Sequence, residues 1–409
     1  MNPGMRRQRG ENTRSAHLPV PAAPQRSPLG LPVWRSSAWG SAGPGGGAAE
    51  AAAQAAGDRI DNPTTAAFAA AVASLEGAAA PEDVAGQAFS SGRAAVNTVL
   101  MTFLRSGAHV VAPVPVDGGT HSLLTNVLSR FGVSADFVDY ADLGRVSAAV
   151  RRSTKIIYAE TISTQAAAVA DIRGLYRIAR GAGALLVVDS TYATPVVCRP
   201  LEHGADLVLH SASTYLGGHD DCTGGIVVGR PDLVARLRAV RADTGAELSP
   251  DEAFLLRRGL ETLPLRVRRM CSTAMVFAAA VAKHPAVRRV DYPGLPHHPG
   301  HRLARHLFDS GPEGTRYGAC VTVVPHGGQE AAARLTGALR LVSAASSAGG
   351  TRTKVAHAAS LGHRRGGGGT GDGRADEAGA VRFSIGLEDA EDLIVDVTRA
   401  LDSLLAAGR

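Results

Sequence analysis

The sequence predicts an α/β fold, with a large domain built on a mostly parallel sheet and a smaller C-terminal α/β domain. Two observations lead to this prediction. Between residues 66 and 256, short apolar runs rich in β-branched residues alternate with helical patterns of about 10–15 residues, which is typical of βαβ units. The chain has 409 residues, of which 45% are hydrophobic, and this is enough for a large core and a second domain.

Each expected element is a run with a recognisable pattern and a recognisable end. The strands are short apolar runs that stop at polar or turn residues, and we expect them at 109–113, 135–138, 155–158, 184–188, 207–209, 226–228, 321–324 and 381–384. The helices carry apolar residues at helical spacing, and several end at a glycine; we expect them at 66–75, 92–104, 121–131, 143–150, 172–180, 254–270 and 389–405.

The composition divides the chain into three parts. Residues 1–56 mix Arg, Pro, Gly and Ala without a periodic apolar pattern, so we expect a disordered tail there. We place the large domain, with an N-terminal arm, at 57–256 and the C-terminal small domain at 257–409. Within the small domain, the Arg/Gly-rich stretch 364–374 is expected to form a mobile loop.

Composition and charge argue against several function classes. The formal net charge is +6, but the basic residues are scattered and no basic stripe is interleaved with aromatics, so nucleic acid is not an expected partner. No apolar run is long enough to span a membrane, and the N-terminus lacks the core of a signal peptide. The four cysteines form no C-x-x-C pair, which favours free thiols in a cytoplasmic protein over a zinc site or disulfides.

Polar residues follow several of the expected strands, at the place where open parallel sheets bind ligands. Asp189 follows one strand, Ser211 and Ser213 follow the next, and Glu160 follows a third. Gly92 opens a helix, and helix N-termini bind anions through free backbone amides. The residues alone therefore predict a crevice with an anion site, hydroxyl groups and a carboxylate at one edge of the sheet.

Several segments in this region resemble one known family. Residues 187–195 are similar to its V-V-D-N-T-F-A-T-P segment, and the stretch at 211–219 is similar to S-A-T-K-Y-L-G-G-H. Further matches lie at 258–266, 292–295 and 384–389, in the same order and spacing. The chain thus resembles the pyridoxal-phosphate (PLP) enzymes of Cys/Met metabolism, such as cystathionine γ-synthase, cystathionine γ-lyase and methionine γ-lyase. This resemblance implies the type I PLP-dependent transferase fold and an amino-acid ligand.

The resemblance also implies roles for individual residues. Asp189 matches the carboxylate that pairs with the pyridinium nitrogen of PLP, and the phosphate would be held at Ser91, Gly92, Arg93, Ser211 and Ser213, with Arg93 in place of a methionine. Arg59 matches an arginine that grips the phosphate of the neighbouring subunit. Arg382 matches the arginine that holds the substrate carboxylate, and Ser347 resembles the serine that assists it.

Four positions depart from the family where its chemistry takes place. Thr214 stands in the place of the lysine that binds PLP covalently and then moves the α-proton, and a threonine hydroxyl can do neither at neutral pH. Asp117 replaces the tyrosine that stacks on the cofactor ring, while Gly57 and Thr164 replace a phosphate-binding tyrosine and a cofactor-binding asparagine. Such clustered changes indicate loss or repurposing of PLP chemistry. Lys354, near the family's active site, is expected to be salt-bridged or on the surface rather than a substitute.

Three functional hypotheses follow from these departures. The first is a degenerate, non-catalytic homologue that is a partner subunit of an active paralogue, with PLP non-covalent or absent. The second is a PLP-binding γ-lyase or γ-synthase of altered mechanism. The third is a PLP-independent binding protein or enzyme that uses Asp117, Asp189 and Arg382, a set of charges that would suit a cationic amino acid. In each case we expect a homo-oligomer, or a heteromer with an active paralogue.

Overall fold

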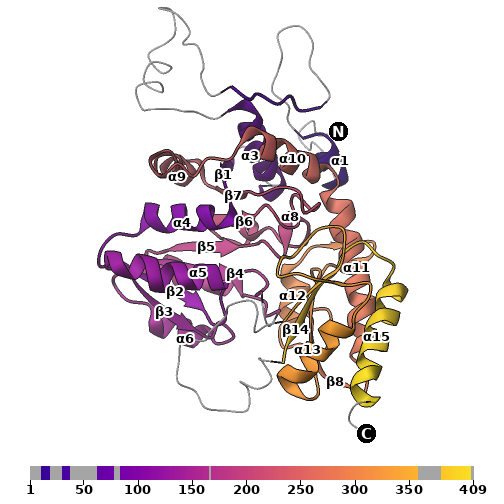
Figure 1. The fold of residues 1–409 in the computed structure, drawn as a ribbon. Helices are drawn as coiled ribbons and strands as arrows, with labels where there is room; N and C mark the ends of the chain where they lie inside the picture. The colour runs from indigo at the N-terminus through magenta and orange to yellow at the C-terminus, as the bar shows by residue number, and fades with distance from the viewer. Residues whose placement is uncertain are drawn as a thin grey trace, which may run out of the picture.

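The computed structural model describes residues 11–18, 30–36, 62–77, 83–164, 167–357 and 379–406. Two sheets dominate these residues, a seven-stranded sheet in the N-terminal part and a five-stranded sheet in the C-terminal part (Figure 1). This arrangement confirms the predicted α/β class, with a large and a small domain. No helix of the described residues is long and apolar enough to cross a membrane.

The larger sheet has the strand order β1-β7-β6-β5-β4-β2-β3. Its strands are β1 (Ala85–Phe89), β2 (His109–Pro113), β3 (Ser134–Val138), β4 (Thr154–Glu160), β5 (Leu185–Asp189), β6 (Leu207–Ser211) and β7 (Gly225–Gly229). Neighbours from β3 to β6 run parallel, whereas β7 is antiparallel to both β6 and β1. Because β4, β5 and β6 are parallel, their last residues, Glu160, Asp189 and Ser211, lie at the same edge of the sheet.

Helices cover both faces of this sheet, because its strands are apolar on both sides. Val187 of β5 belongs to a core cluster that includes Val99 and Leu237 from α4 (Gly92–Phe103) and α9 (Pro231–Thr244). On the opposite face, Val188 belongs to a second cluster with residues of α3 (Pro63–Glu76), α7 (Ile172–Ala182) and α10 (Pro250–Glu261). Further helical elements of this part are α5 (Gly118–Ser122), α6 (Leu143–Ala149), α8 (Thr194–Val197) and a 3-10 turn (Pro200–His203).

The smaller sheet has the order β12-β13-β14-β11-β8, with only the β12–β13 pair parallel. Its strands are β8 (Val287–Asp291), β11 (Cys320–Pro325), β12 (Ser343–Ala344), β13 (Lys354–His357) and β14 (Val381–Ser384). The helices packed with it are α11 (Leu263–Val281), α13 (Gly328–Ala338) and α15 (Ala390–Ala406), and α12 (His301–Leu307) and the β9–β10 pair (Ser310–Gly311, Gly314–Thr315) complete this part. Phe277 of α11 packs on Phe383 of β14 with ring centroids 5.3 Å apart, which joins helix to sheet.

The structure differs from the sequence prediction in several elements. The helix expected at 121–131 is divided into α5, a π-helical turn (Leu123–Val127) and a 3-10 turn (Leu128–Phe131). The single helix expected at 254–270 is two helices, because Pro264 in the first turn of α11 lacks the amide that would continue α10. Strands β1, β8 and β13 were not expected, and each carries polar residues that interrupt the apolar pattern.

The expected disorder of the 1–56 tail is wrong at residues 11–18, where α1 (Glu11–Ala16) packs on the molecule. The Glu11 carboxylate pairs with Arg199, Arg268 and Arg316, and Leu18 is buried. Charge pairing, rather than an apolar repeat, therefore docks this helix. The boundary placed at 256 falls inside α10 and stays a prediction, and the loop 364–374 lies outside the described residues.

The Phe277–Phe383 contact generates a stability prediction. Phe383 is fully buried, so Phe383→Ala should lower the free energy of unfolding by about 3–5 kcal/mol. Val395 is 67% exposed on α15, so Val395→Ala should change it by less than about 0.5 kcal/mol. Denaturant unfolding of both variants checks this, and equal losses would show that the contact does not hold the smaller sheet to α11.

Candidate functional site

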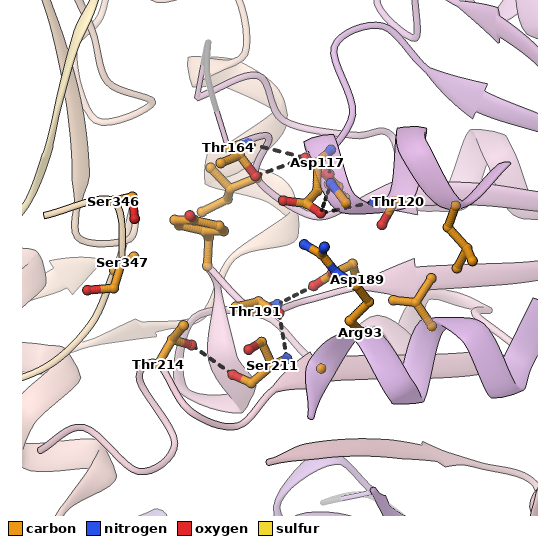
Figure 2. Close-up of a pocket in the computed structure, with 18 residues that line it drawn as sticks. Arg93, Asp117, Thr120, Thr164, Asp189, Thr191, Ser211, Thr214, Ser346 and Ser347 are labelled. Carbon is orange, nitrogen blue, oxygen red and sulfur yellow. Dashed lines mark hydrogen bonds between the residues drawn. The ribbon is translucent and has the colours of Figure 1, made fainter. Parts of the chain in front are cut away.

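One cavity lies at the edge of the larger sheet where β4, β5 and β6 end. The start of α4, the turn before α5 and a loop of the smaller domain form its other walls (Figure 2). The residues that line it are Gly92, Arg93, Val96, Asp117, Gly119, Thr120, Leu123, Glu160, Ile162, Thr164, Asp189, Thr191, Tyr192, Ser211, Thr214, Ser346, Ser347 and Ala348. The cavity therefore brings together segments from both domains.

The start of α4 forms an anion-binding end of this cavity. The Ser91 hydroxyl accepts a hydrogen bond from the Ala94 amide at 3.0 Å, which caps the helix and leaves the amides of Gly92 and Arg93 without an acceptor among the described residues. A side chain at Gly92 would meet Ser211, because its Cβ would lie 2.6 Å from the Ser211 Cβ. The glycine thus lets the free amides and the hydroxyl of Ser211 approach one point.

Asp189 lies at the centre of the cavity edge. One of its oxygens accepts a hydrogen bond from the Thr191 amide at 2.9 Å, and the other accepts from the Tyr158 hydroxyl at 3.3 Å. Burial raises the pKa of this carboxyl, while the hydrogen bonds from Thr191 and the charge of His210 oppose that rise. The carboxylate is therefore a strong acceptor for a cationic N–H group that enters the cavity.

Glu160 stands beside Asp189 on the neighbouring strand, with the two residues paired in register. Its oxygens accept hydrogen bonds from the Asp117 amide at 2.6 Å and from the Thr164 amide at 3.2 Å. Burial, together with the charges of Asp189 and Asp117, raises the pKa of Glu160 to about 8. The side chain thus fixes the turn that carries Asp117 and tends to hold a proton at neutral pH.

Asp117 is the helix cap of α5 and also faces the cavity (Figure 2). Its Oδ1 accepts hydrogen bonds from the amides of Gly119 at 2.9 Å and Thr120 at 3.1 Å. Its Oδ2 accepts no hydrogen bond from the described residues. Arg93 extends from α4 toward this carboxylate and packs against Gly119, yet it forms no ion pair within the described structure.

Thr214 lies in the turn after β6, on the same side of the cavity as Ser346 and Ser347 (Figure 2). Its hydroxyl donates a hydrogen bond to the Ser211 carbonyl oxygen at 2.8 Å. The hydroxyl of the nearby Ser213 bonds to the backbone of Gly224, and its side chain is not among the cavity-lining groups found in the described residues. The Ser213 hydroxyl therefore stabilises the turn in this structure.

Arg382 stands behind the wall formed by the smaller domain. It is only 3% exposed, and it donates hydrogen bonds to the Tyr192 hydroxyl and to the Ser346 carbonyl oxygen, both at 2.8 Å. Its Nε is buried without a hydrogen-bond partner in the described structure. Burial raises the pKa of Tyr192, and the arginine charge opposes that rise. A guanidinium held in this way is ready to bind a carboxylate.

None of the three lysines lines the cavity. Lys155 and Lys283 are exposed. Lys354 is buried and forms an ion pair with Asp220, and it also donates a hydrogen bond to the Gly349 carbonyl oxygen at 2.9 Å. The expectation that Lys354 is salt-bridged is therefore confirmed.

The structure brings most of the predicted site residues to this one cavity. Those that line it are Gly92, Arg93, Asp117, Asp189, Ser211, Thr214 and Ser347, while Ser91, Ser213 and Arg382 stand directly behind the lining. Arg59 and Gly57 lie outside the described residues. Thr191 and Tyr192 were not selected from the sequence, although they sit in the motif that begins at Val187.

Comparison with known proteins places this cavity in a family. The sequence profile described as "Cys/Met metabolism PLP-dependent enzyme" matches residues 13–402. The chain belongs to this family. It is 42% identical over 348 residues to an L-methionine gamma-lyase of Pseudomonas putida, a match that covers 84% of each protein.

Two solved structures show the same fold. The metB protein of Corynebacterium glutamicum superposes with a TM-score of 0.87 at 33% identity, covering 97% of this chain and 98% of that one. A Campylobacter jejuni protein described as an O-acetylhomoserine (thiol)-lyase superposes with a TM-score of 0.83 at 26% identity, covering 96% and 99%. That structure contains N'-pyridoxyl-lysine-5'-monophosphate at its position 205, a lysine joined to the cofactor.

The residues present fit the phosphate and the ring nitrogen of PLP. Free amides at the start of α4 next to the Ser211 hydroxyl suit a phosphate, and the buried Asp189 suits a protonated pyridine nitrogen. No lysine is among the described lining residues. The residue at position 117 is an aspartate, so that position supplies no aromatic ring. The site therefore fits the cofactor group by group, except at the positions that would bond to it or stack on it.

The raised pKa of Glu160 predicts how stability changes with pH. The folded protein binds this proton more tightly than the unfolded chain does, whose carboxyl has a pKa near 4.5, so the stabilisation is complete below about pH 4.5 and is lost as pH rises through about 8. In that window Glu160 should lower the free energy of unfolding by up to about 1.4 kcal/mol per pH unit.

Unfolding of the cofactor-free protein between these pH values checks the prediction. Glu160→Gln should remove this slope, whereas Glu247→Gln, at an exposed position, should leave it unchanged. Parallel stability curves for Glu160→Gln and the unmodified protein would contradict the assignment of the proton to Glu160.

Proposed function

We propose that this protein is a γ-lyase- or γ-synthase-type member of its family that holds PLP without a covalent lysine link and acts by an altered mechanism. The observation that carries this proposal is the composition of the cavity wall. The groups suited to the phosphate and the ring nitrogen are together, but Thr214 stands in the lysine segment of the family motif and no lysine lines the cavity. Similarity to L-methionine gamma-lyase supports the reaction class.

Each end of the cofactor would have its own residues. The amides of Gly92 and Arg93 and the hydroxyl of Ser211 would bind the phosphate, with Ser91 and Ser213 holding the two backbone segments in place. Asp189 would accept a hydrogen bond from the ring nitrogen and keep it protonated. When bound, PLP supplies an electron sink for charge that develops at the substrate's α-carbon.

The substrate would be oriented from the smaller domain. Arg382 would bind the α-carboxylate in a bidentate contact, with the hydroxyl of Ser347 beside it. Thr214 keeps its proton in a hydrogen bond to the Ser211 carbonyl oxygen, so it cannot accept one from the substrate. Proton movement would then depend on the substrate's own amine or on another subunit, and turnover should be slow compared with a lysine-bearing relative.

A second candidate function is that of a partner subunit. The same loss of the lysine would be harmless if this chain completed the site of an active paralogue, with Arg59 as the residue that reaches the neighbour. A homo-oligomer without such a paralogue favours the first function. Co-purification with a lysine-bearing paralogue, and turnover only by the mixed assembly, favours the second.

The covalent state of the cofactor tests the main proposal. Purified protein with added PLP, reduced with borohydride and mapped by mass spectrometry, should show bound cofactor but no lysine adduct. Thr214→Lys should restore an adduct at residue 214, because the new amine would enter the cavity wall. An adduct on Lys354 in the unmodified protein, or failure to bind PLP, would overturn the proposal.

The affinity for PLP tests the role of Asp189. Asp189→Asn should weaken binding by about tenfold or more, because a buried charged partner of the ring nitrogen is lost. Asp139→Asn is a matched control, since Asp139 accepts an amide hydrogen bond from two residues ahead in the same way but is exposed. Titration of PLP followed by absorbance measures both, and equal affinities would remove Asp189 from the cofactor site.

A further inference from the structure

We infer that the amino acid bound in this cavity has a positively charged side chain, which the carboxylate of Asp117 holds. This inference rests on the proposed function, because it takes the cofactor position from there, and it adds the class of substrate. It begins from an imbalance of charge. Three carboxylates, Asp117, Glu160 and Asp189, line the cavity, whereas Arg93 is the single cationic side chain among the described lining residues.

Two of these carboxylates already have other partners. Asp189 would face the ring nitrogen of PLP, so its charge would be offset by a protonated pyridine. Glu160 has its oxygens turned to the amides of Asp117 and Thr164, and its pKa of about 8 keeps it largely neutral near pH 7. Asp117 is then the remaining carboxylate of the described lining, and neither the cofactor nor an ion pair is assigned to it.

The geometry of Asp117 leaves one oxygen available. Both α5 amides bind its Oδ1, at 2.9 Å and 3.1 Å, and these bonds fix the orientation of the carboxylate. Its Oδ2 accepts no hydrogen bond from the described residues, and the side chain faces the cavity (Figure 2). A fixed carboxylate with a free oxygen is suited to an ammonium or guanidinium group, with which a charge-assisted hydrogen bond forms.

Arg93 does not occupy the free oxygen of Asp117. Its guanidinium packs against Gly119 without forming an ion pair with Asp117 in the described structure. Arg93 is also the second residue of α4, next to the amides that suit the phosphate. A phosphate bound there carries more negative charge than the guanidinium can offset, so the region around Asp117 stays open to a second cation.

The opposite wall supplies the other half of the recognition. Arg382 is 3% exposed, its Nε lacks a hydrogen-bond partner among the described residues, and it bonds to Tyr192 and Ser346 of the cavity wall. Burial opposes its charge, but Tyr192, Cys320, Tyr215 and Asp117 together raise the pKa of Arg382. A substrate with an α-carboxylate at one end and a cation at the other therefore matches both walls.

Binding of matched amino acids tests this inference. L-Arginine and its uncharged isostere L-citrulline form one pair, and L-ornithine and L-methionine form a shorter pair. Isothermal titration of the protein, with PLP and without it, should show that the cationic member of at least one pair binds about tenfold more tightly or better. Because the readout is binding, it does not depend on turnover.

Two variants make the test specific. Asp117→Asn keeps a capping side chain but removes the charge, and it should abolish the preference. Asp142→Asn is the matched control, because Asp142 caps α6 through the amides of Gly144 and Arg145 in the same way, on the exposed surface. This variant should keep the preference.

The outcomes separate this inference from the proposed function. If PLP fails to bind, the proposed function is wrong, but a cationic preference that Asp117→Asn abolishes in the PLP-free protein still supports the inference. If neutral amino acids bind as well as cationic ones in both pairs, or if Asp117→Asn keeps the preference, the inference is wrong even when PLP binds. Arg93→Met adds a check in the PLP-free protein, where no phosphate offsets this cation: the preference should become stronger there, and a weaker preference would count against the inference.

Discussion

The close contact between the start of α4 and the end of β6 is the constraint on which the site depends. A side chain at residue 92 would put its Cβ 2.6 Å from the Cβ of Ser211, so only glycine allows the helix to begin at this place. That position turns the free amides of α4 toward the sheet edge where Asp189 ends β5. The Thr214 turn follows Ser211 directly, so the same contact also fixes the wall that lacks an amine.

The second constraint is the crowding of carboxylates at one sheet edge. Glu160 and Asp189 are paired in register on adjacent parallel strands, and the Glu160 side chain holds the amide of Asp117. Burial of these groups together favours a proton on Glu160. This proton lowers the negative charge at the sheet edge. The charge of the cavity is therefore set by how protons are divided among the three acids.

The sequence allowed prediction of the fold class and of residues that sit at strand ends or helix starts, such as Asp189, Ser211 and Gly92. These positions follow from topology, because parallel strands end at one edge. The sequence could not show that Arg93 packs against Gly119, that Ser213 bonds to Gly224, or that Arg382 reaches Tyr192. Those contacts depend on side-chain rotamers and on how the two domains pack against each other. Neither can be predicted from a local sequence pattern. Helix α1 escaped prediction for a related reason, since distant charges hold it in place.

Helix α1 also contacts both of the parts of the chain that carry the two sheets. Glu11 stands among three guanidinium groups, one from Arg199 near the larger sheet and two from Arg268 and Arg316 in the C-terminal part. Without the Glu11 carboxylate, these three arginines would repel one another where the two parts of the chain meet. Among the described residues, Glu202, Asp309 and Glu313 would then offset their positive charge. Through Glu11, the segment 11–18 thus ties together arginines from both parts of the chain, although it is far from them in sequence.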